Sequence, residues 1–157
     1  MQSFSTSSYN ESSGSLLALT YFASSLIMKN TLTILIVDDS EIIRELLKLT
    51  LQKLGHSGVM VNNGEEALRC LDERNFDLVL MDVTMPVMDG LTALKLLRQK
   101  EQISNQVNVR QPVILITGND LPSDLEKFID AGADGFVSKP VNLEALRNEI
   151  SKVMPGE

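Results

Sequence analysis

Three aspartates, a threonine and a lysine stand at the ends of short apolar runs: Asp38, Asp39, Asp82, Thr117 and Lys139. Carboxylates held together raise one another's pKa and cost free energy unless a cation lies among them. Mg²⁺ is a natural partner because it prefers oxygen ligands. A lysine beside them would counter the charge of an arriving phosphoryl group. This set therefore suits phosphoryl transfer onto an aspartate, with the metal shielding the approach of one anion to another.

The elements that must position these residues alternate, from Thr33 onward, between short apolar runs and longer stretches of helical periodicity. This alternation is typical of a single α/β domain with a parallel sheet. The expected strands are Thr33–Val37, Gly58–Val61, Asp77–Met81, Val113–Thr117 and Asp134–Val137. Right-handed crossovers send every strand-to-helix loop of such a sheet to one edge. We therefore expect the five polar residues to meet there.

Helical stretches lie between the expected strands, and their apolar residues recur at a spacing that predicts buried stripes. A further helix is expected from Gly64, after Asn62 and Asn63, with acidic residues in its first turn. Residues 101–111 lack periodicity and are expected to form a loop. The predicted stripes are Ile43, Leu46, Leu47, Thr50 and Leu54; Leu91, Leu94 and Leu97; Leu125, Phe128 and Ile129; and Leu143, Leu146, Ile150 and Val153.

Each polar residue also has a simpler interpretation. Asp38 or Asp39 could cap the following helix, and Asp82 could cap or turn in the same way. Lys139 could be a solvated turn residue and Thr117 an ordinary strand end. The functional interpretation is favoured because acid, acid, hydroxyl and amine coincide at the ends of four strands that the topology brings together.

Bulk composition limits the function classes. The 157 residues carry 14 Lys and Arg against 21 Asp and Glu, a formal charge of -7, which disfavours direct binding to nucleic acid. The single cysteine, Cys70, cannot form an internal disulfide, and a cytoplasmic location is expected. His56 is alone and is expected to be a solvated loop residue.

The first 30 residues form a Ser-rich leader that becomes apolar toward Ile27. The leader has no positive region before its apolar part and no run of about 20 apolar residues, so neither a secretory signal nor a membrane span is expected. We expect a disordered or non-native extension, with Met28 as the natural start. The domain is expected over residues 31–154, and residues 155–157 form a C-terminal tail.

The chain resembles the receiver domain of two-component response regulators, and the resemblance covers nearly everything from Thr31 to Val153. Order and spacing agree throughout. The matching pieces are Ile34-Leu35-Ile36-Val37-Asp38-Asp39, Leu80-Met81-Asp82-Val83-Thr84-Met85-Pro86-Val87-Met88-Asp89-Gly90, Ile116-Thr117-Gly118 and Gly132-Ala133-Asp134-Gly135-Phe136-Val137-Ser138-Lys139-Pro140.

The resemblance implies a doubly wound, flavodoxin-like fold with five parallel strands in the order 2-1-3-4-5. It implies that Asp82 accepts the phosphoryl group. Asp39 would bind Mg²⁺ directly, Asp38 directly or through water, and the carbonyl of Thr84 would supply another oxygen.

For the remaining residues, the resemblance implies that Lys139 pairs with the phosphoryl oxygens and that its bond to Pro140 is cis. Thr117 would move to bind the phosphate, and Phe136 would turn inward and export the change to an output face. Phe136 could also be plain core packing. In this family the residues two positions after the acceptor and after Thr117 influence how long the phosphate survives. They are Thr84 and Asn119 here, and their polarity leaves that lifetime open.

These implications describe a signalling switch rather than an enzyme, although the switch would catalyse its own phosphorylation and dephosphorylation. The phosphoryl donor would be a histidine kinase or a histidine phosphotransfer protein, and the output an unidentified protein, with no nucleic acid and no membrane as partner. The chain could be a stand-alone receiver or part of a hybrid kinase. The alternatives are a Mg²⁺-dependent phosphohydrolase with an Asp nucleophile and a binding-only pseudo-receiver.

Overall fold

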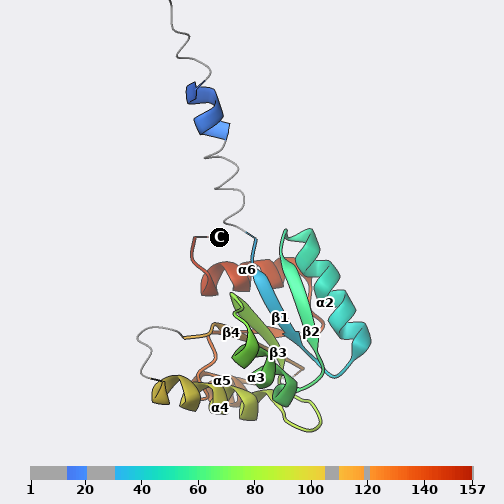
Figure 1. The fold of residues 1–157 in the computed structure, drawn as a ribbon. Helices are drawn as coiled ribbons and strands as arrows, with labels where there is room; N and C mark the ends of the chain where they lie inside the picture. Colours follow the sequence, from blue (N-terminus) through green and yellow to red (C-terminus); the bar gives the residue numbers. More distant parts are fainter. Residues whose placement is uncertain (1–13, 21–30, 105–109, 119–120, 157) are drawn as a thin grey trace, which may run out of the picture. The chain divides into compact units, whose positions relative to one another are not determined.

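The computed structural model describes residues 14–20, 31–104, 110–118 and 121–156 (Figure 1). The chain divides into two units, Met1–Thr31 and Leu32–Glu157. In the first unit, residues 14–20 form a short helix whose three leucines are exposed. The rest of the predicted leader lies outside the described residues, and its disordered or non-native character stays a prediction. No helix in the described ranges is long and apolar enough to cross a bilayer.

In the second unit, strands and helices alternate along the chain. The strands are β1 (Thr33–Val37), β2 (Ser57–Val61), β3 (Leu78–Asp82), β4 (Val113–Thr117) and β5 (Gly135–Ser138). The helices are α2 (Glu41–Lys53), α3 (Gly64–Glu73), α4 (Gly90–Ile103), α5 (Pro122–Asp130) and α6 (Leu143–Val153).

The five strands form one parallel sheet in the order β2-β1-β3-β4-β5, which confirms the predicted α/β class and strand order. The predicted strand bounds were one residue off in three cases. β2 begins at Ser57, one residue early, because Ser57 pairs with Thr33. β3 and β5 each begin and end one residue later than predicted, so that Asp82 is the last residue of β3.

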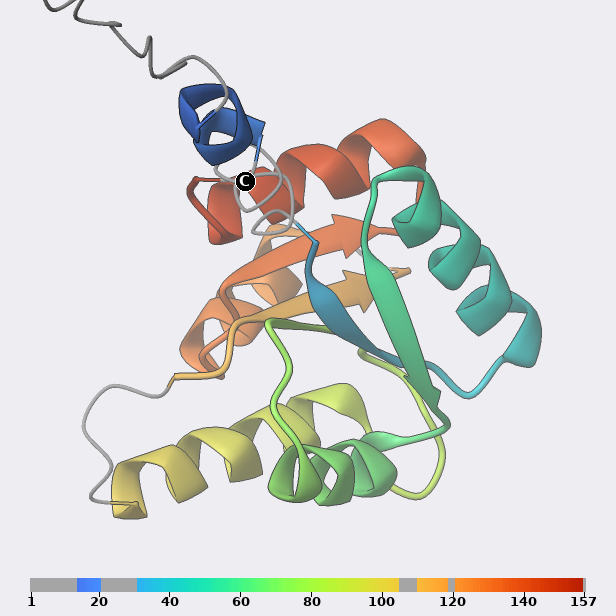
Figure 2. The same ribbon diagram turned by 45° about the horizontal axis from the view of Figure 1, so that its top comes forward.

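Helices cover both faces of the sheet (Figure 2). Leu47 and Leu51 of α2 pack with Leu146 and Ile150 of α6 on one face. On the other face the buried residues come from α3, α4 and α5, and Leu94 of α4 is fully buried there. Both faces of β1, β3 and β4 are therefore shielded from solvent, which explains their continuous apolar sequences.

The predicted stripes were too wide. Leu46, Ile129 and Leu143 are exposed rather than buried. Consecutive positions on a helix lie about 100° apart, so Leu46 turns away from the sheet where its neighbour Leu47 faces it. The predicted loop over residues 101–111 was also wrong at its start, because α4 continues to Ile103.

Polar residues begin the helices at the loops that surround the site. The N-caps are Ser40 for α2, Asn63 for α3, Asp89 for α4 and Asn142 for α6, and each accepts a backbone N–H from the first turn. The predicted start of α3 is thus confirmed. Asp38, Asp39 and Asp82 cap no helix in the described part of the chain, so their simpler interpretation as caps is wrong.

His56 lies in the turn between α2 and β2, but it is not simply solvated. Its Nδ1 accepts the backbone N–H of Leu32 at 3.3 Å. The half-buried imidazole therefore helps hold the start of β1 in place.

Candidate functional site

The carboxyl edge of the sheet carries a compact charged site, which we call the acidic notch and define by Asp38, Asp39, Asp82 and Lys139. The Nζ of Lys139 lies 3.1 Å from Oδ1 of Asp82 and 3.3 Å from Oδ2 of Asp38. Asp38 and Asp39 directly follow β1, Asp82 is the last residue of β3, and Lys139 directly follows β5. The structure therefore brings together the acids and the amine that the sequence pattern placed at one edge.

Asp38 is fully buried and makes hydrogen bonds with several neighbouring residues. Its Oδ1 accepts the backbone N–H of Ser40 at 2.8 Å, while its own N–H donates to Val61 on β2 at 3.4 Å. Its backbone carbonyl accepts Nη1 of Arg44 at 2.8 Å. Sequence reasoning did not predict a role for Arg44. Its position one turn into the helix after the acid pair is the only signal that could have indicated it.

Asp82 is 4 % exposed and ends the central strand β3. Its Oδ1 accepts the backbone N–H of Thr84 at 3.4 Å. Helix α4 begins directly against this strand end, since a Cβ on Gly90 would lie 2.2 Å from the carbonyl oxygen of Asp82. Close packing on a glycine thus fixes the backbone of Asp82 while its side chain faces the notch.

Burial and the neighbouring charges shift the pKa values in the notch. Burial raises the pKa of Asp82 above its ordinary value, and the hydrogen bond and charge of Lys139 reduce that rise without cancelling it. For Lys139, burial alone would lower the pKa, but the hydrogen bonds and charges of Asp82 and Asp38 outweigh burial and raise it. The ammonium therefore stays charged, and the notch favours a cation over further negative charge.

The three aspartates fit a metal ion. One carboxylate oxygen from each of Asp38, Asp39 and Asp82 can be chosen so that all lie within 4.8 Å of one another. Asp38 and Asp82 are buried, whereas Asp39 is exposed. An all-oxygen set that is open to solvent on one side suits Mg²⁺, which keeps several waters. The structure shows a backbone contact of Thr84 to Asp82 but does not test its carbonyl as a ligand, so that role stays a prediction.

Thr117 is 2 % exposed at the end of β4. Its backbone carbonyl accepts the N–H of Lys139 at 2.7 Å, and it pairs in register with Ser138. The Lys139–Pro140 bond is cis, as predicted. Asn119 lies outside the described residues.

Phe136 is half-buried and packs against the core cluster that α3 and α4 cover. Its backbone N–H donates to Oε1 of Glu149 on α6 at 3.1 Å. Packing of this kind agrees with the simpler interpretation of Phe136 and does not test its role as a switch, which stays a prediction.

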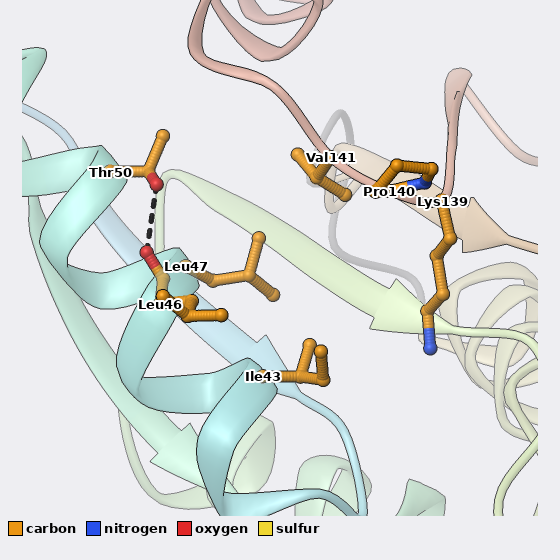
Figure 3. Close-up of a pocket in the computed structure, with 7 residues that line it drawn as sticks. All are labelled: Ile43, Leu46, Leu47, Thr50, Lys139, Pro140 and Val141. Atoms are coloured by element: carbon orange, nitrogen blue, oxygen red, sulfur yellow. Dashed lines mark hydrogen bonds between the residues drawn. The ribbon is translucent and has the colours of Figure 1, made fainter.

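An apolar groove of about 410 Å³ lies beside Lys139 (Figure 3). Side chains of α2 form one wall, and Lys139, Pro140 and Val141 form the other. Lys139 lines the groove with its aliphatic stem, and its ammonium points away from Val141. Apolar surface therefore borders the charged notch directly. The lining residues on α2 are Ile43, Leu46, Leu47 and Thr50.

A family model described as "Response regulator receiver domain" matches residues 34–151. A curated relative, "Probable histidine kinase 1" of Oryza sativa subsp. indica, is 33 % identical in an alignment that covers 82 % of this chain and 16 % of that protein. The chain thus spans about a sixth of the length of that kinase.

Two solved structures extend the comparison. The chemotaxis response regulator CheY4 of Vibrio cholerae superposes with a TM-score of 0.70 at 31 % identity, covering 80 % of this chain and 100 % of CheY4. The receiver domain of a sensor histidine kinase from Pseudomonas aeruginosa gives 0.68 at 28 % identity, covering 78 % and 97 %. The latter structure has a magnesium ion coordinated in its active-site cleft.

Proposed function

Because this chain belongs to the response regulator receiver family, which makes it a signalling module rather than a conventional enzyme, we propose that it takes a phosphoryl group from a phosphohistidine onto Asp82. The observation that carries this proposal is the placement of Asp82. Its carboxylate is buried at the centre of an acidic notch and lies 3.1 Å from the ammonium of Lys139.

In the proposed step, a carboxylate oxygen of Asp82 attacks the phosphorus of the donor. A bond from that oxygen to phosphorus forms while the bond from the donor's imidazole nitrogen to phosphorus breaks, and the nitrogen keeps the electron pair. Lys139 provides fixed positive charge for the phosphoryl oxygens. Mg²⁺, held by Asp38, Asp39, Asp82 and the carbonyl of Thr84, would neutralise the charge that two approaching anions bring together.

The donor is proposed to be a histidine kinase or a histidine phosphotransfer protein. The curated relative above is named as a histidine kinase, which supports a donor of this class. The surface around the notch also supports a protein donor. The apolar groove adjoins Lys139, and Ile42, Leu46 and Leu49 of α2 are exposed near it, a combination that favours contact with another protein.

Output is proposed to pass through the end of β4 and β5. A phosphoryl group on Asp82 brings new acceptor oxygens next to Lys139 and near Thr117, whose side chain would turn toward them. Phe136 lies two residues before Ser138, the register partner of Thr117. A change at Thr117 can therefore bias the packing of Phe136, and the resulting surface would be read by a downstream protein.

Intact mass measurement tests the proposal. The wild-type chain is incubated with acetyl phosphate and Mg²⁺, and it should gain one phosphoryl group that is lost on treatment with hydroxylamine, as expected of an acyl phosphate. Asp82→Asn should gain none, and chelation of Mg²⁺ should suppress the reaction in the wild type. An unmodified wild type, under conditions in which CheY4 reacts, would contradict the proposal and favour a binding-only pseudo-receiver.

A further inference from the structure

Val87, in the loop between β3 and α4, has a backbone conformation that valine rarely adopts. Its φ is 69°, and among the residues that the structure describes it is the only non-glycine residue with positive φ. A β-branched side chain in this region is a true outlier, because its Cβ substituents crowd the backbone. The side chain is 77 % exposed, so burial within this chain does not offset the strain.

The loop is held in this conformation from both sides of Val87. The N–H of Met88 donates to the carbonyl of Pro86 at 2.8 Å, which closes a γ-turn centred on Val87. The carbonyl of Met88 in turn accepts the N–H of Gly64 at 3.1 Å. A Cβ on Gly64 would lie 2.9 Å from that carbonyl oxygen and 2.8 Å from Ala93, so α3 approaches the loop closely only through a glycine.

The other end of the loop is tied to the strand of the phosphoacceptor. The N–H of Gly90 donates to the carbonyl of Val83 at 3.0 Å, and Asp89 caps α4. The γ-turn is therefore a rigid feature that presents one apolar side chain to solvent, five residues after Asp82 and at the same edge of the sheet.

We propose that Val87 determines specificity for the protein that donates the phosphoryl group, by packing against an apolar surface next to its phosphohistidine. This inference rests on the proposed function. An apolar residue on a rigid turn loses little conformational freedom on binding and so makes an efficient anchor. The strained backbone gives the Val87 side chain little contact within the chain. A contact with a partner protein would explain why this conformation is kept. A small phosphodonor would not reach Val87.

The test compares two substitutions that both remove the β-branch. Asparagine tolerates positive φ and is polar, whereas leucine keeps an apolar side chain without branching at Cβ. Wild type, Val87→Asn and Val87→Leu are phosphorylated by acetyl phosphate and by each histidine kinase and histidine phosphotransfer protein of the source genome. The protein donors are first labelled with radioactive ATP, directly or through their kinase.

For the fastest protein donor, kcat/KM for Val87→Asn should fall about tenfold or more, the loss typical of a buried apolar anchor. With the same donor, kcat/KM for Val87→Leu should stay within about threefold of the wild-type value. The rate with acetyl phosphate should be unchanged in both. Thermal midpoints no lower than wild type would show that both variants fold.

Ile103 provides a matched control. It is 82 % exposed and is the last residue of α4, thirteen residues after Gly90. Because a helix rises about 1.5 Å per residue, Ile103 lies far from the loop that carries Val87. Ile103→Asn should leave both reactions unchanged.

Two outcomes would overturn the role of Val87. In the first, Val87→Asn accepts phosphate from the protein donor at the wild-type rate. In the second, the rates with acetyl phosphate and with the protein donor fall equally, which would mean that the turn positions Asp82. Failure of the proposed function is distinguishable, because the wild type would then take no phosphate from acetyl phosphate. A wild type that reacts with acetyl phosphate but with no protein donor would overturn the Val87 proposal together with the phosphohistidine donor, while leaving Asp82 as the phosphoacceptor.

Discussion

The ammonium of Lys139 contacts both Asp38 and Asp82, at 3.3 and 3.1 Å, and so bridges two buried carboxylates that come from different strands. The bridge means that the group expected to bind phosphoryl oxygens already lies beside the expected acceptor. It also means that the acidic notch contains one fixed positive charge before any metal or phosphate arrives.

Replacing Lys139 with methionine should slow phosphorylation by acetyl phosphate. Loss of one preorganised positive charge next to the reacting oxygens typically costs about 100-fold to 1000-fold in rate. The rate is measured by intact mass with saturating Mg²⁺. Lys127→Met is the control, since Lys127 is exposed and pairs only with Asp124 among the described residues. Equal rates for Lys139→Met and wild type would exclude the proposed role.

Asp82→Asn should make the metal-free protein more stable at neutral pH. The pKa of Asp82 is raised by folding, so the folded chain holds this proton more tightly than the unfolded chain. Stability of the wild type should then decline as pH rises from the unfolded value of 3.8 through the higher folded pKa, and level off above it. The asparagine side chain of the variant does not titrate, so this decline should be missing from it.

The comparison is made by urea denaturation in EDTA between about pH 4 and pH 8, the range that the raised pKa of a carboxyl group makes informative. The advantage of Asp82→Asn should grow with pH and shrink when Mg²⁺ is added, because the ion would stabilise the ionised wild type. An advantage that is constant with pH would show that ionisation of Asp82 is not its cause.

Asp134→Ala should destabilise the fold at the edge opposite the notch. Arg98 is almost buried, and its guanidinium donates to Asp134, to Glu101 and to the carbonyls of Gly132 and Gln111. Asp134→Ala removes one of the two carboxylates that pair with Arg98 and leaves Glu101 as the other, so we expect a loss of about 1–3 kcal/mol in urea denaturation. Arg69→Ala, which breaks the exposed pair with Glu65, should cost less than about 1 kcal/mol. Equal losses for the two variants would contradict this account.

Glu149→Ala should release the backbone of Phe136. The carboxylate of Glu149 reaches the N–H of Phe136 across Gly135, where a Cβ would lie 2.5 Å from Oε1. Exchange of the Phe136 amide hydrogen, followed by NMR, should therefore speed up in Glu149→Ala and in Gly135→Ala. Glu149→Gln keeps an acceptor oxygen and should retain protection. Unchanged exchange in Gly135→Ala would show that the amide is protected by something other than Glu149.

Much of the notch could be predicted from the sequence because it depends on few rules. Apolar runs followed by Asp38, Asp82, Thr117 and Lys139 indicated parallel strands, and the ends of parallel strands share one edge. Which aspartate accepts the phosphoryl group did not follow from those rules and came from the resemblance to receivers.

Other features could not be predicted, because they depend on distances between elements. The hydrogen bond from Arg44 to the carbonyl of Asp38 depends on the path of the loop between β1 and α2. The turn at Val87, with its positive φ, is held by the hydrogen bond that Gly64 of α3 donates to Met88. Leu46 and Leu47 have the same residue type, and only the orientation of α2 decides which of them is buried.

The most direct test of the central claim is a crystal structure of the chain grown with Mg²⁺ and beryllofluoride, a mimic of the phosphoryl group. We predict that beryllium is bound to a carboxylate oxygen of Asp82, with a fluorine in contact with the ammonium of Lys139 and the metal bound by Asp39 and Asp82. Beryllofluoride bound elsewhere, or an Asp82 side chain that remains bare while Mg²⁺ is present, would contradict the assignment of Asp82 as the phosphoacceptor.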